Sequence, residues 1–249
     1  MTEELIVHQA SELHAAGFRH AFFACGESAE LHAQARGGIT HAQVAVSRGR
    51  MVRCLAVMPE ALHCVRQVHG DRILEVTRGA ERRQWLDTEG DALMTRGKGI
   101  AVGIVTADCA PLLVADPTSG WVAAAHLGRL GALAGLAGKL VRRLQERGAC
   151  LETMIFAVGP HIQASSYEVG EAMFAALPLV AQFQDERGRY CCSLKGLIGA
   201  DLEAVGVRSD QIQWSPLDTF SDHRFFSHRR QGCEAGRQLS AIVGGCSGG

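Results

Sequence analysis

Residues 99–117 read GIAVGIVTADCAPLLVADP, and this segment decides the fold that we predict for the chain. Two apolar arms, AVGIV and PLLVA, flank a short polar hinge that contains Asp108 and Cys109. Short runs of valine and isoleucine that close on glycine or Asp-Pro are typical of buried strands. We therefore expect two buried strands with a carboxylate and a thiol between them. Because an unpaired buried carboxylate is unfavourable, both groups need partners, and the partners of Cys109 are the functional question.

The composition indicates a globular protein. The chain has 249 residues, of which 47% are hydrophobic and 20% charged, and this length fits one large domain or two small ones that share a core. The net charge of −1 gives no basic field for nucleic acid, so we expect no nucleic-acid partner. Asp108 and Pro111 interrupt the longest apolar run, so we expect no membrane span either. An odd number of cysteines, nine, and no secretory signal predict a reduced, cytoplasmic protein.

Outward from this segment, hydrophobic periodicity predicts alternating strands and helices. We expect a strand followed by a short helix over residues 43–57, and a loop over residues 26–40. The remaining strands are expected at residues 20–25, 65–68, 73–76, 91–95, 121–125, 154–158, 190–194 and 212–215. The remaining helices are expected at residues 2–16, 132–147 and 197–205, and from about Gly170.

Three metal-ligating side chains stand at the ends of these apolar segments. His69, Cys109 and His126 each follow a predicted strand at a polar hinge. Two imidazoles and a thiolate suit zinc, and three protein ligands leave a fourth position open for water or substrate. The spacing is unlike that of a compact CxxC site, so it supports a metal only weakly. A Cys109 nucleophile activated by His126, with Asp108 as orienter, and a purely structural role are the alternatives.

Cations gather in residues 227–237, SHRRQGCEAGR. Arg229, Arg230 and Arg237 are either a solvated surface or a clamp for phosphate or carboxylate. Neither a Walker loop nor GxGxxG after a strand, GxSxG or HExxH occurs in the sequence. Nucleotide binding through those loops is therefore not expected.

Six motifs occur in an order that resembles the YfiH-like family, also called the laccase-domain or peptidoglycan editing factor family. The resemblance spans residues 60–240, most of the chain, and we expect one domain over residues 1–249. The motifs are RQVHGDRI (66–73), GDALMT (90–95), VTADCAPLLVADP (105–117), VAAAHLG (122–128), VGPHIQASSYEVG (158–170) and FFSHRRQGCEAGR (225–237).

The resemblance implies an α+β fold, a single domain with mixed β-sheets packed between helices. It implies a zinc site made by His69, Cys109 and His126, and purine nucleoside phosphorylase activity on adenosine, inosine and methylthioadenosine, with adenosine deaminase activity. Phosphate would then be the second substrate, with Arg229 and Arg230 as its contacts. Family descriptions also include copper-dependent polyphenol oxidation and correction of peptidoglycan precursors. Copper is less favoured, because no two of the eleven histidines form an HxH pair.

The chain departs from the family pattern after the second histidine. The family motif HAGWRG is HLGRLG here, so Arg129 replaces the tryptophan and Leu130 the arginine. Leucine cannot hydrogen-bond an anionic substrate group. Arg129 could replace the missing arginine only from the adjacent position, which a helix rotates by about 100°. Two alternatives to the zinc enzyme therefore remain. One is a metal-free cysteine hydrolase or amidase of peptidoglycan precursors that uses Cys109 and His126, and the other is a catalytically degenerate binding paralogue.

Overall fold

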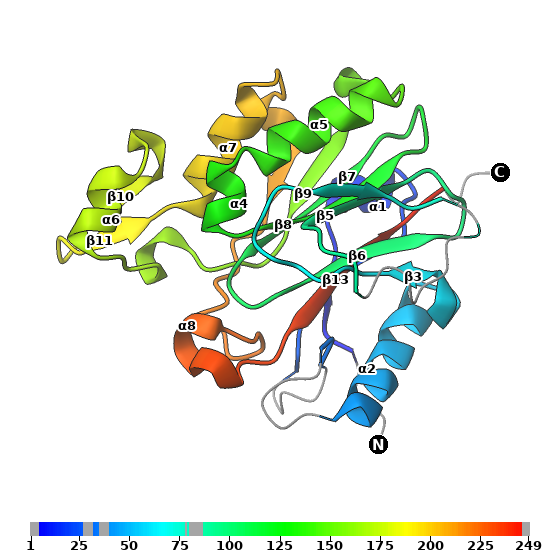
Figure 1. Ribbon diagram of the computed structural model, residues 1–249, viewed down its shortest axis with the longest axis horizontal. Helices are drawn as coiled ribbons and strands as arrows, with labels where there is room; N and C mark the ends of the chain where they lie inside the picture. The colour runs from blue at the N-terminus through cyan, green and yellow to red at the C-terminus, as the bar shows by residue number, and fades with distance from the viewer. Residues whose placement is uncertain (1–4, 27–31, 35–39, 78, 80–86, 246–249) are drawn as a thin grey trace.

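The computed structural model describes residues 5–26, 32–34, 40–77, 79 and 87–245 (Figure 1). Its strands form a five-stranded sheet, a six-stranded sheet and a two-stranded ribbon. The five-stranded sheet has the order β1 (Val7–His8), β2 (His20–Phe23), β13 (Gln238–Val243), β6 (Ala101–Thr106) and β3 (Leu62–His63). The six-stranded sheet has the order β12 (Ile212–Trp214), β9 (Ile155–Val158), β7 (Ala110–Ala115), β8 (Val122–Leu127), β5 (Ala92–Thr95) and β4 (Ile73–Glu75). The ribbon pairs β10 (Gln182–Gln184) with β11 (Tyr190–Cys192).

Both large sheets are mixed. In each, most neighbours are antiparallel, while β3 runs parallel to β6, β4 to β5 and β12 to β9. The α-helices of the described chain are α1 (Ser11–Ala15), α2 (His41–Cys54), α4 (Arg129–Leu133), α5 (Leu136–Glu146), α6 (Glu171–Ala176), α7 (Leu194–Glu203) and α8 (His228–Gln231). Short 3-10 turns lie at Pro59–Ala61, Leu151–Thr153, Ala164–Ser166, Leu179–Ala181, Ser209–Gln211 and Gly232–Glu234. None of the described helices is long and apolar enough to cross a bilayer.

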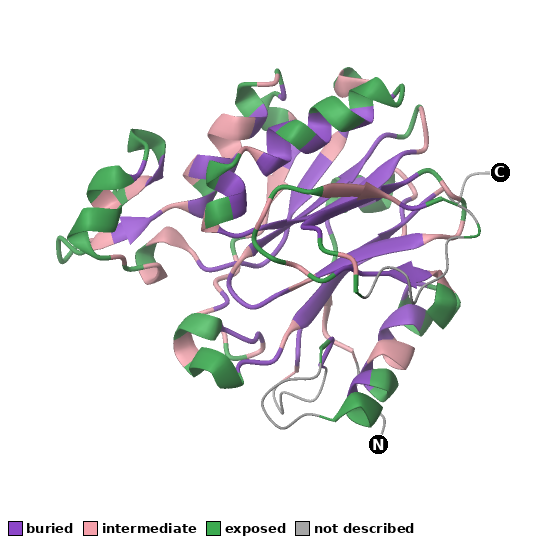
Figure 2. Ribbon diagram, viewed as in Figure 1, coloured by how far each residue is buried: buried purple, intermediate pink, exposed green. Residues whose placement is uncertain are grey.

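The two large sheets pack face to face, with helices outside. Along β8, Ala123 and Ala125 pack with the buried face of α5, whereas Val122 and Ala124 face the core between the sheets. Strand β6 of the other sheet contributes Val102 and Ile104 to the same inter-sheet core. The far face of the five-stranded sheet packs against Met51, Val52 and Leu55 around α2. Because alternate residues of a strand point to opposite faces, strands covered on both sides are buried along most of their length, as Figure 2 shows for the central strands.

The predicted fold class is confirmed, and so is the central pair of strands. The apolar arms of residues 99–117 are β6 and β7, and all six residues of β7 are buried. The two strands belong to different sheets: β6 pairs with β13 and β3, whereas β7 pairs with β8 and β9. The hinge between them, residues 107–109, therefore carries the chain from one sheet to the other.

Residues 43–57 do not form the predicted strand and short helix. The structure has one helix, α2, which begins after Thr40 with a capping box. Thr40 Oγ1 accepts from the Gln43 backbone N–H, and the Gln43 side chain accepts from the Thr40 N–H. This cap satisfies two backbone donors at the start of the helix, and the strand prediction overlooked the Thr-x-x-Gln signal.

Two further elements differ from the prediction. Residues 65–68 alternate apolar and polar without forming a strand. Arg66 makes an isolated backbone bridge to Glu89, and the side chain of Gln67 bonds both the N–H and the C=O of Val105. The helix expected over residues 132–147 is divided into α4 and α5 at Gly135, whose φ of +73° is left-handed. Glycine adopts this conformation without the steric penalty of a Cβ.

At the termini the prediction was incomplete. The helix expected at residues 2–16 is only α1, preceded by β1, and residues 1–4 lie outside the described residues, as does part of the loop expected at 26–40. Strand β13, which lies at the centre of its sheet, was not predicted. Its sequence, QLSAIV, follows the cation-rich segment and has no turn signal of its own. The other predicted strands and helices appear within a few residues of their expected bounds.

Candidate metal centre

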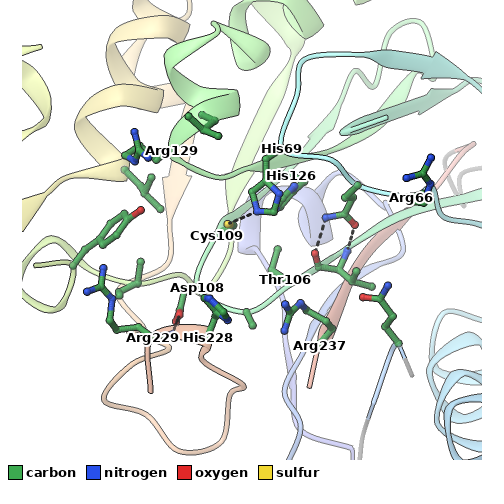
Figure 3. Close-up of a pocket in the computed structure, with 18 of the residues that line it drawn as sticks. Arg66, His69, Thr106, Asp108, Cys109, His126, Arg129, His228, Arg229 and Arg237 are labelled. Carbon is green, nitrogen blue, oxygen red and sulfur yellow. Dashed lines mark hydrogen bonds between the residues drawn. The ribbon is translucent and has the colours of Figure 1, made fainter. Parts of the chain in front are cut away.

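His69, Cys109 and His126 meet at one end of the inter-sheet space, as predicted. Their ligand atoms all lie within 4.8 Å of one another, and His69 Nε2 lies 4.0 Å from Cys109 Sγ. Figure 3 shows the three side chains converging from different parts of the chain. His69 stands in the turn before β4, Cys109 in the hinge between β6 and β7, and His126 near the end of β8. The three donors thus form a possible metal site.

Asp91 holds two of the three ligands in place. Its carboxylate, fully buried, accepts a hydrogen bond from His126 Nδ1 at 2.8 Å. It also accepts from the backbone N–H groups of Val68, His69 and Gly70, at 3.2, 3.0 and 2.7 Å. The bond to Nδ1 leaves His126 Nε2 as the nitrogen that could bind a metal, and a carboxylate behind a histidine ligand fixes the ring orientation. One side chain therefore joins the end of β8 to the His69 turn.

Two residues of the site have left-handed backbone conformations. His69 has φ +60° and Asp108 has φ +87°. Such conformations are unfavourable for residues with a side chain, and they persist where surrounding bonds enforce them. Asp91 supplies those bonds to the His69 turn. Asp108 accepts from Thr219 Oγ1 at 2.7 Å and from the Arg229 N–H at 2.6 Å, which secures the hinge.

Gly128 is required by the close approach of two ligands. A Cβ at this position would lie 2.9 Å from Cys109 Sγ and 3.1 Å from His69 Cδ2. The first contact is shorter than ordinary Cβ atoms tolerate. The absence of a side chain between β8 and α4 is therefore a condition for His69 and Cys109 to meet.

Electrostatics favour the thiolate of Cys109 in the metal-free site. Burial raises the pKa of the Cys109 thiol, but the charge of His126 and hydrogen bonds from His126 and His69 outweigh it and lower the pKa to about 6. Burial lowers the pKa of His126, while the Cys109 thiolate and Asp91 raise it to about 9. At neutral pH the metal-free pair is a thiolate and an imidazolium. Metal binding at His126 therefore releases a proton.

A cavity of about 670 Å³ opens onto the three ligands. Figure 3 shows Arg129 and Arg229 on one side of Cys109 and Thr106 on the other. The remaining lining residues are Gln34, Val65, Arg66, Gln67, Val105, Ala107, Asp108, Leu130, Ile162, Tyr167, Leu194, His228 and Arg237. A volume of this size suits a small-molecule ligand.

The predicted arginine contacts divide into two groups. Arg129 and Arg229 line the cavity around Tyr167: the Arg229 guanidinium lies 5.3 Å from the ring centroid, and the positive charge of Arg129 acts on the Tyr167 hydroxyl and lowers its pKa against the larger effect of burial. Arg230 is absent from the lining. Its guanidinium donates to the carbonyls of Thr219, Phe220 and Phe225. That arrangement ties Arg230 to the loop before α8, outside the cavity lining, and its predicted role as a phosphate contact gains no support.

Sequence reasoning missed Asp91 as the residue that orients His126. The prediction gave this part to Asp108, but the Asp108 carboxylate bonds Thr219 and the Arg229 backbone. Asp91 stood inside the motif GDALMT, directly before a predicted buried strand, and a carboxylate in that position requires partners. Tyr167 and Thr106 were also missed as lining residues; Tyr167 lay in a predicted loop and Thr106 in the hinge. Only the folded chain places them beside the ligands.

Comparison with known proteins shows which family the chain resembles. A family model described as multi-copper polyphenol oxidoreductase laccase matches residues 18–244. A protein of Deinococcus radiodurans named purine nucleoside phosphorylase is 35% identical over 202 residues, 80% of this chain and 76% of the relative. A protein of Streptomyces coelicolor, also named as a purine nucleoside phosphorylase, is 35% identical over 193 residues, 75% of this chain and 77% of the relative.

Solved structures share the fold over nearly the whole chain. The crystal structure of YlmD from Geobacillus stearothermophilus has a TM-score of 0.84 at 27% identity and covers 98% of this chain and 97% of that one. The Bacillus licheniformis hypothetical protein YfiH has a TM-score of 0.85 at 24% identity and covers 98% of each chain. With the family model spanning most of the sequence and the six motifs in order, the chain belongs to the YfiH/laccase-like family.

Proposed function

We propose that this protein is a zinc-dependent purine nucleoside phosphorylase that accepts adenosine, inosine and methylthioadenosine and also deaminates adenosine. The observation that carries the proposal is the convergence of His69, Cys109 and His126 at a cavity whose lining includes Arg129 and Arg229. The names of the relatives from Deinococcus radiodurans and Streptomyces coelicolor support the purine nucleoside phosphorylase part of this proposal.

The donor set fits zinc. Around a tetrahedral zinc, thiolate and imidazole donor atoms lie about 3.3–3.7 Å apart. The 4.0 Å between Cys109 Sγ and His69 Nε2 is within a small side-chain movement of that value. Asp91 supplies the carboxylate behind His126 that metal-binding histidines usually have. Three protein ligands and an adjoining cavity are the pattern of a catalytic zinc site with one open position.

Zinc, when bound, supplies a Lewis acid at the cavity. The chain's own residues bind and orient the reactants. Phosphorolysis breaks the bond between the ribose and the base and forms a bond from the ribose to phosphate, so an anion must be held beside the nucleoside. Arg129 and Arg229 lie together around Tyr167, and guanidinium groups bind phosphate through paired hydrogen bonds. Asp108 fixes Arg229 by accepting its backbone N–H.

Copper chemistry of the multicopper type is less well supported. Such sites need several clustered histidines. Within the part of the chain that the structure describes, His69, Cys109 and His126 are the one group of three or more potential ligands close enough to hold a metal ion. A single three-residue centre with a thiolate suits zinc better than a multicopper array.

The first experiment measures metal content by elemental analysis of protein purified without a histidine tag. We expect about one zinc per chain in the wild type and in Cys54→Ser, an exposed cysteine on α2. Cys109→Ser should lose the zinc. The same samples are then assayed for release of adenine and hypoxanthine from nucleosides in the presence of phosphate. Wild-type phosphorolysis rates in Cys109→Ser, or phosphorolysis by metal-free wild-type protein, would contradict the proposal.

A specific observation favours one second candidate, a metal-free cysteine hydrolase or amidase. Cys109, His126 and Asp91 form a nucleophile, base and orienter, and the lowered pKa of Cys109 provides a thiolate at neutral pH. Chelated protein that still hydrolyses an amide of a peptidoglycan precursor, and loses this activity on thiol alkylation, would favour this candidate. If neither activity occurs while nucleosides bind, the degenerate binding paralogue is the correct description.

A further inference from the structure

Thr106 is the last residue of β6 and faces the open end of the inter-sheet space. Along β6, Val102 and Ile104 belong to the inter-sheet core, and Thr106 continues the same face two residues later. His126 continues the corresponding face of β8 after Val122 and Ala124. Thr106 and the metal ligand His126 therefore look into one cavity from opposite sheets.

The hydroxyl of Thr106 is buried and has no partner. Thr106 is 1% exposed, and Oγ1 finds no hydrogen-bond partner among the residues that the structure describes. The Gln67 amide directs its oxygen and its nitrogen to the backbone of Val105 instead. Buried polar atoms in folded proteins are usually satisfied, and an orphan in a cavity wall indicates a ligand group that completes it.

The surroundings of Thr106 suit a planar heterocycle. Ala107, the next residue, and Val65, which belongs to the same inter-sheet core as Val102 and Ile104, are both buried apolar residues that line the cavity. The arginines around Tyr167, which suit an anion, lie on the other side of Cys109 (Figure 3). Arg237 also lines the cavity, but its Nη1 donates to the carbonyls of Ala235 and Gly236. Apolar surface with one unpartnered hydroxyl is typical of a site that orients an aromatic ring.

We propose that Thr106 Oγ1 hydrogen-bonds the six-position group of the purine base, an assignment that rests on the proposed function. A hydroxyl rotates to donate or to accept. It accepts from the 6-amino group of adenine and donates to the 6-oxo group of hypoxanthine. One side chain thereby lets the cavity accept both adenosine and inosine, which an amide or a carboxylate in a fixed orientation would not do equally well.

The test measures equilibrium binding of adenine, hypoxanthine and unsubstituted purine by calorimetry. Thr106→Val keeps the shape of the side chain and removes the hydroxyl. We expect it to bind adenine and hypoxanthine at least tenfold more weakly than the wild type and unsubstituted purine equally well. Thr106→Ser, which keeps a hydroxyl, should stay within a few-fold of the wild type for all three bases.

A stability readout separates this role from a structural one. Removing an unsatisfied hydroxyl should leave the melting temperature of Thr106→Val equal to or above that of the wild type. Thr95→Val is the matched control, since Thr95 is also a buried strand residue but its hydroxyl donates to the Val76 carbonyl. It should melt at a lower temperature and bind the bases unchanged.

Two binding results would overturn the inference, and a separate phosphorolysis assay distinguishes both from failure of the proposed function. Equal adenine affinity in wild type and Thr106→Val would remove Thr106 from base recognition, as would a wild type that binds none of the three bases. Phosphorolysis by the same wild-type sample is measured in parallel. Turnover with unchanged Thr106→Val affinity leaves the proposed function intact, whereas lack of turnover contradicts the function itself.

Discussion

At the scale of single residues, Asp91 is the centre of the site's polar network. Its carboxylate accepts four hydrogen bonds, one from the His126 ring and three from the backbone of residues 68–70. Burial raises the pKa of Asp91, but these bonds outweigh it and hold the pKa below its usual value, so the group is an anion at neutral pH. It is therefore the negative charge behind the proposed zinc centre. Removing that charge should weaken the hydrogen bond that orients the His126 ring and the hydrogen bonds that hold the turn at residues 68–70.

Asp91→Asn should lower zinc affinity by about 10- to 100-fold, because the amide holds His126 less firmly and adds no charge. The measurement is competition against a chelator of known affinity. Asp71→Asn is the control: Asp71 lies in the same turn but is half exposed and pairs with Lys139. Equal zinc affinity of Asp91→Asn and the wild type would contradict the role of Asp91.

The thiol of Cys109 should titrate near pH 6 in metal-free protein. Burial opposes the thiolate, but the charge of His126 stabilises it more strongly, so the thiolate fraction rises as the pH rises through about 6. The measurement is the rate of iodoacetamide alkylation of Cys109 against pH, followed by mass spectrometry. Cys54, whose pKa is raised by burial, serves as internal reference. A midpoint near that of Cys54 would contradict the assignment.

At the scale of elements, the short helix α4 determines which side chains of the altered motif, HLGRLG at residues 126–131, line the cavity. It begins after Gly128, and its first two residues, Arg129 and Leu130, both line the cavity. Arg129 reaches Tyr167, whereas the Leu130 side chain is 54% exposed. Position 130, where the family pattern has an arginine, is thus a leucine, and the adjacent Arg129 lines the same cavity.

Leu130→Arg should strengthen the interaction with phosphate. A guanidinium at this position would join Arg129 at the cavity, and one added hydrogen bond to a charged group corresponds to about tenfold in affinity. The measurement is the KM for phosphate in phosphorolysis. Leu133→Arg is the control, since Leu133 is 44% exposed on the same helix and lies outside the cavity lining. A KM that is unchanged in Leu130→Arg, or that falls equally in both variants, would contradict this prediction.

At the scale of the whole molecule, the site joins the two large sheets. His126 belongs to a strand of the six-stranded sheet, and Cys109 stands where the chain passes from the five-stranded sheet to the six-stranded one. A ligand that binds only the folded arrangement stabilises it by mass action. Metal binding should therefore stabilise the packing of the sheets as well as the local turns.

Zinc should raise the melting temperature of the chelated protein. At a free concentration one hundred times the dissociation constant, the stabilisation is about 2.7 kcal/mol. For a chain of this size that corresponds to about 5–11 °C. The measurement is thermal unfolding with and without zinc, and Cys109→Ser should show a much smaller rise. Equal rises in wild type and variant would place the zinc elsewhere on the protein.

The sequence by itself determined the local chemistry and most of the strands. The apolar arms of residues 99–117 predicted β6 and β7, because an uninterrupted run of small and branched apolar residues is stable only when both faces are covered. The strand-end positions of His69, Cys109 and His126 identified them as candidate metal ligands, and the six motifs predicted the family, from which a shared site of the three residues was expected. These features are local, since each depends on residues close together in the chain.

Only the tertiary structure decided which distant groups meet. The apolar arms show that two strands are buried but cannot show that they lie in different sheets, since strand pairing depends on partners far along the chain, such as β13 for β6. For the same reason, the sequence could not predict that Asp91 bonds His126 or that the Thr106 hydroxyl is left without a partner. Hydrogen bonds between residues separated by tens of positions form when packing brings the sheets together, and no local pattern records them.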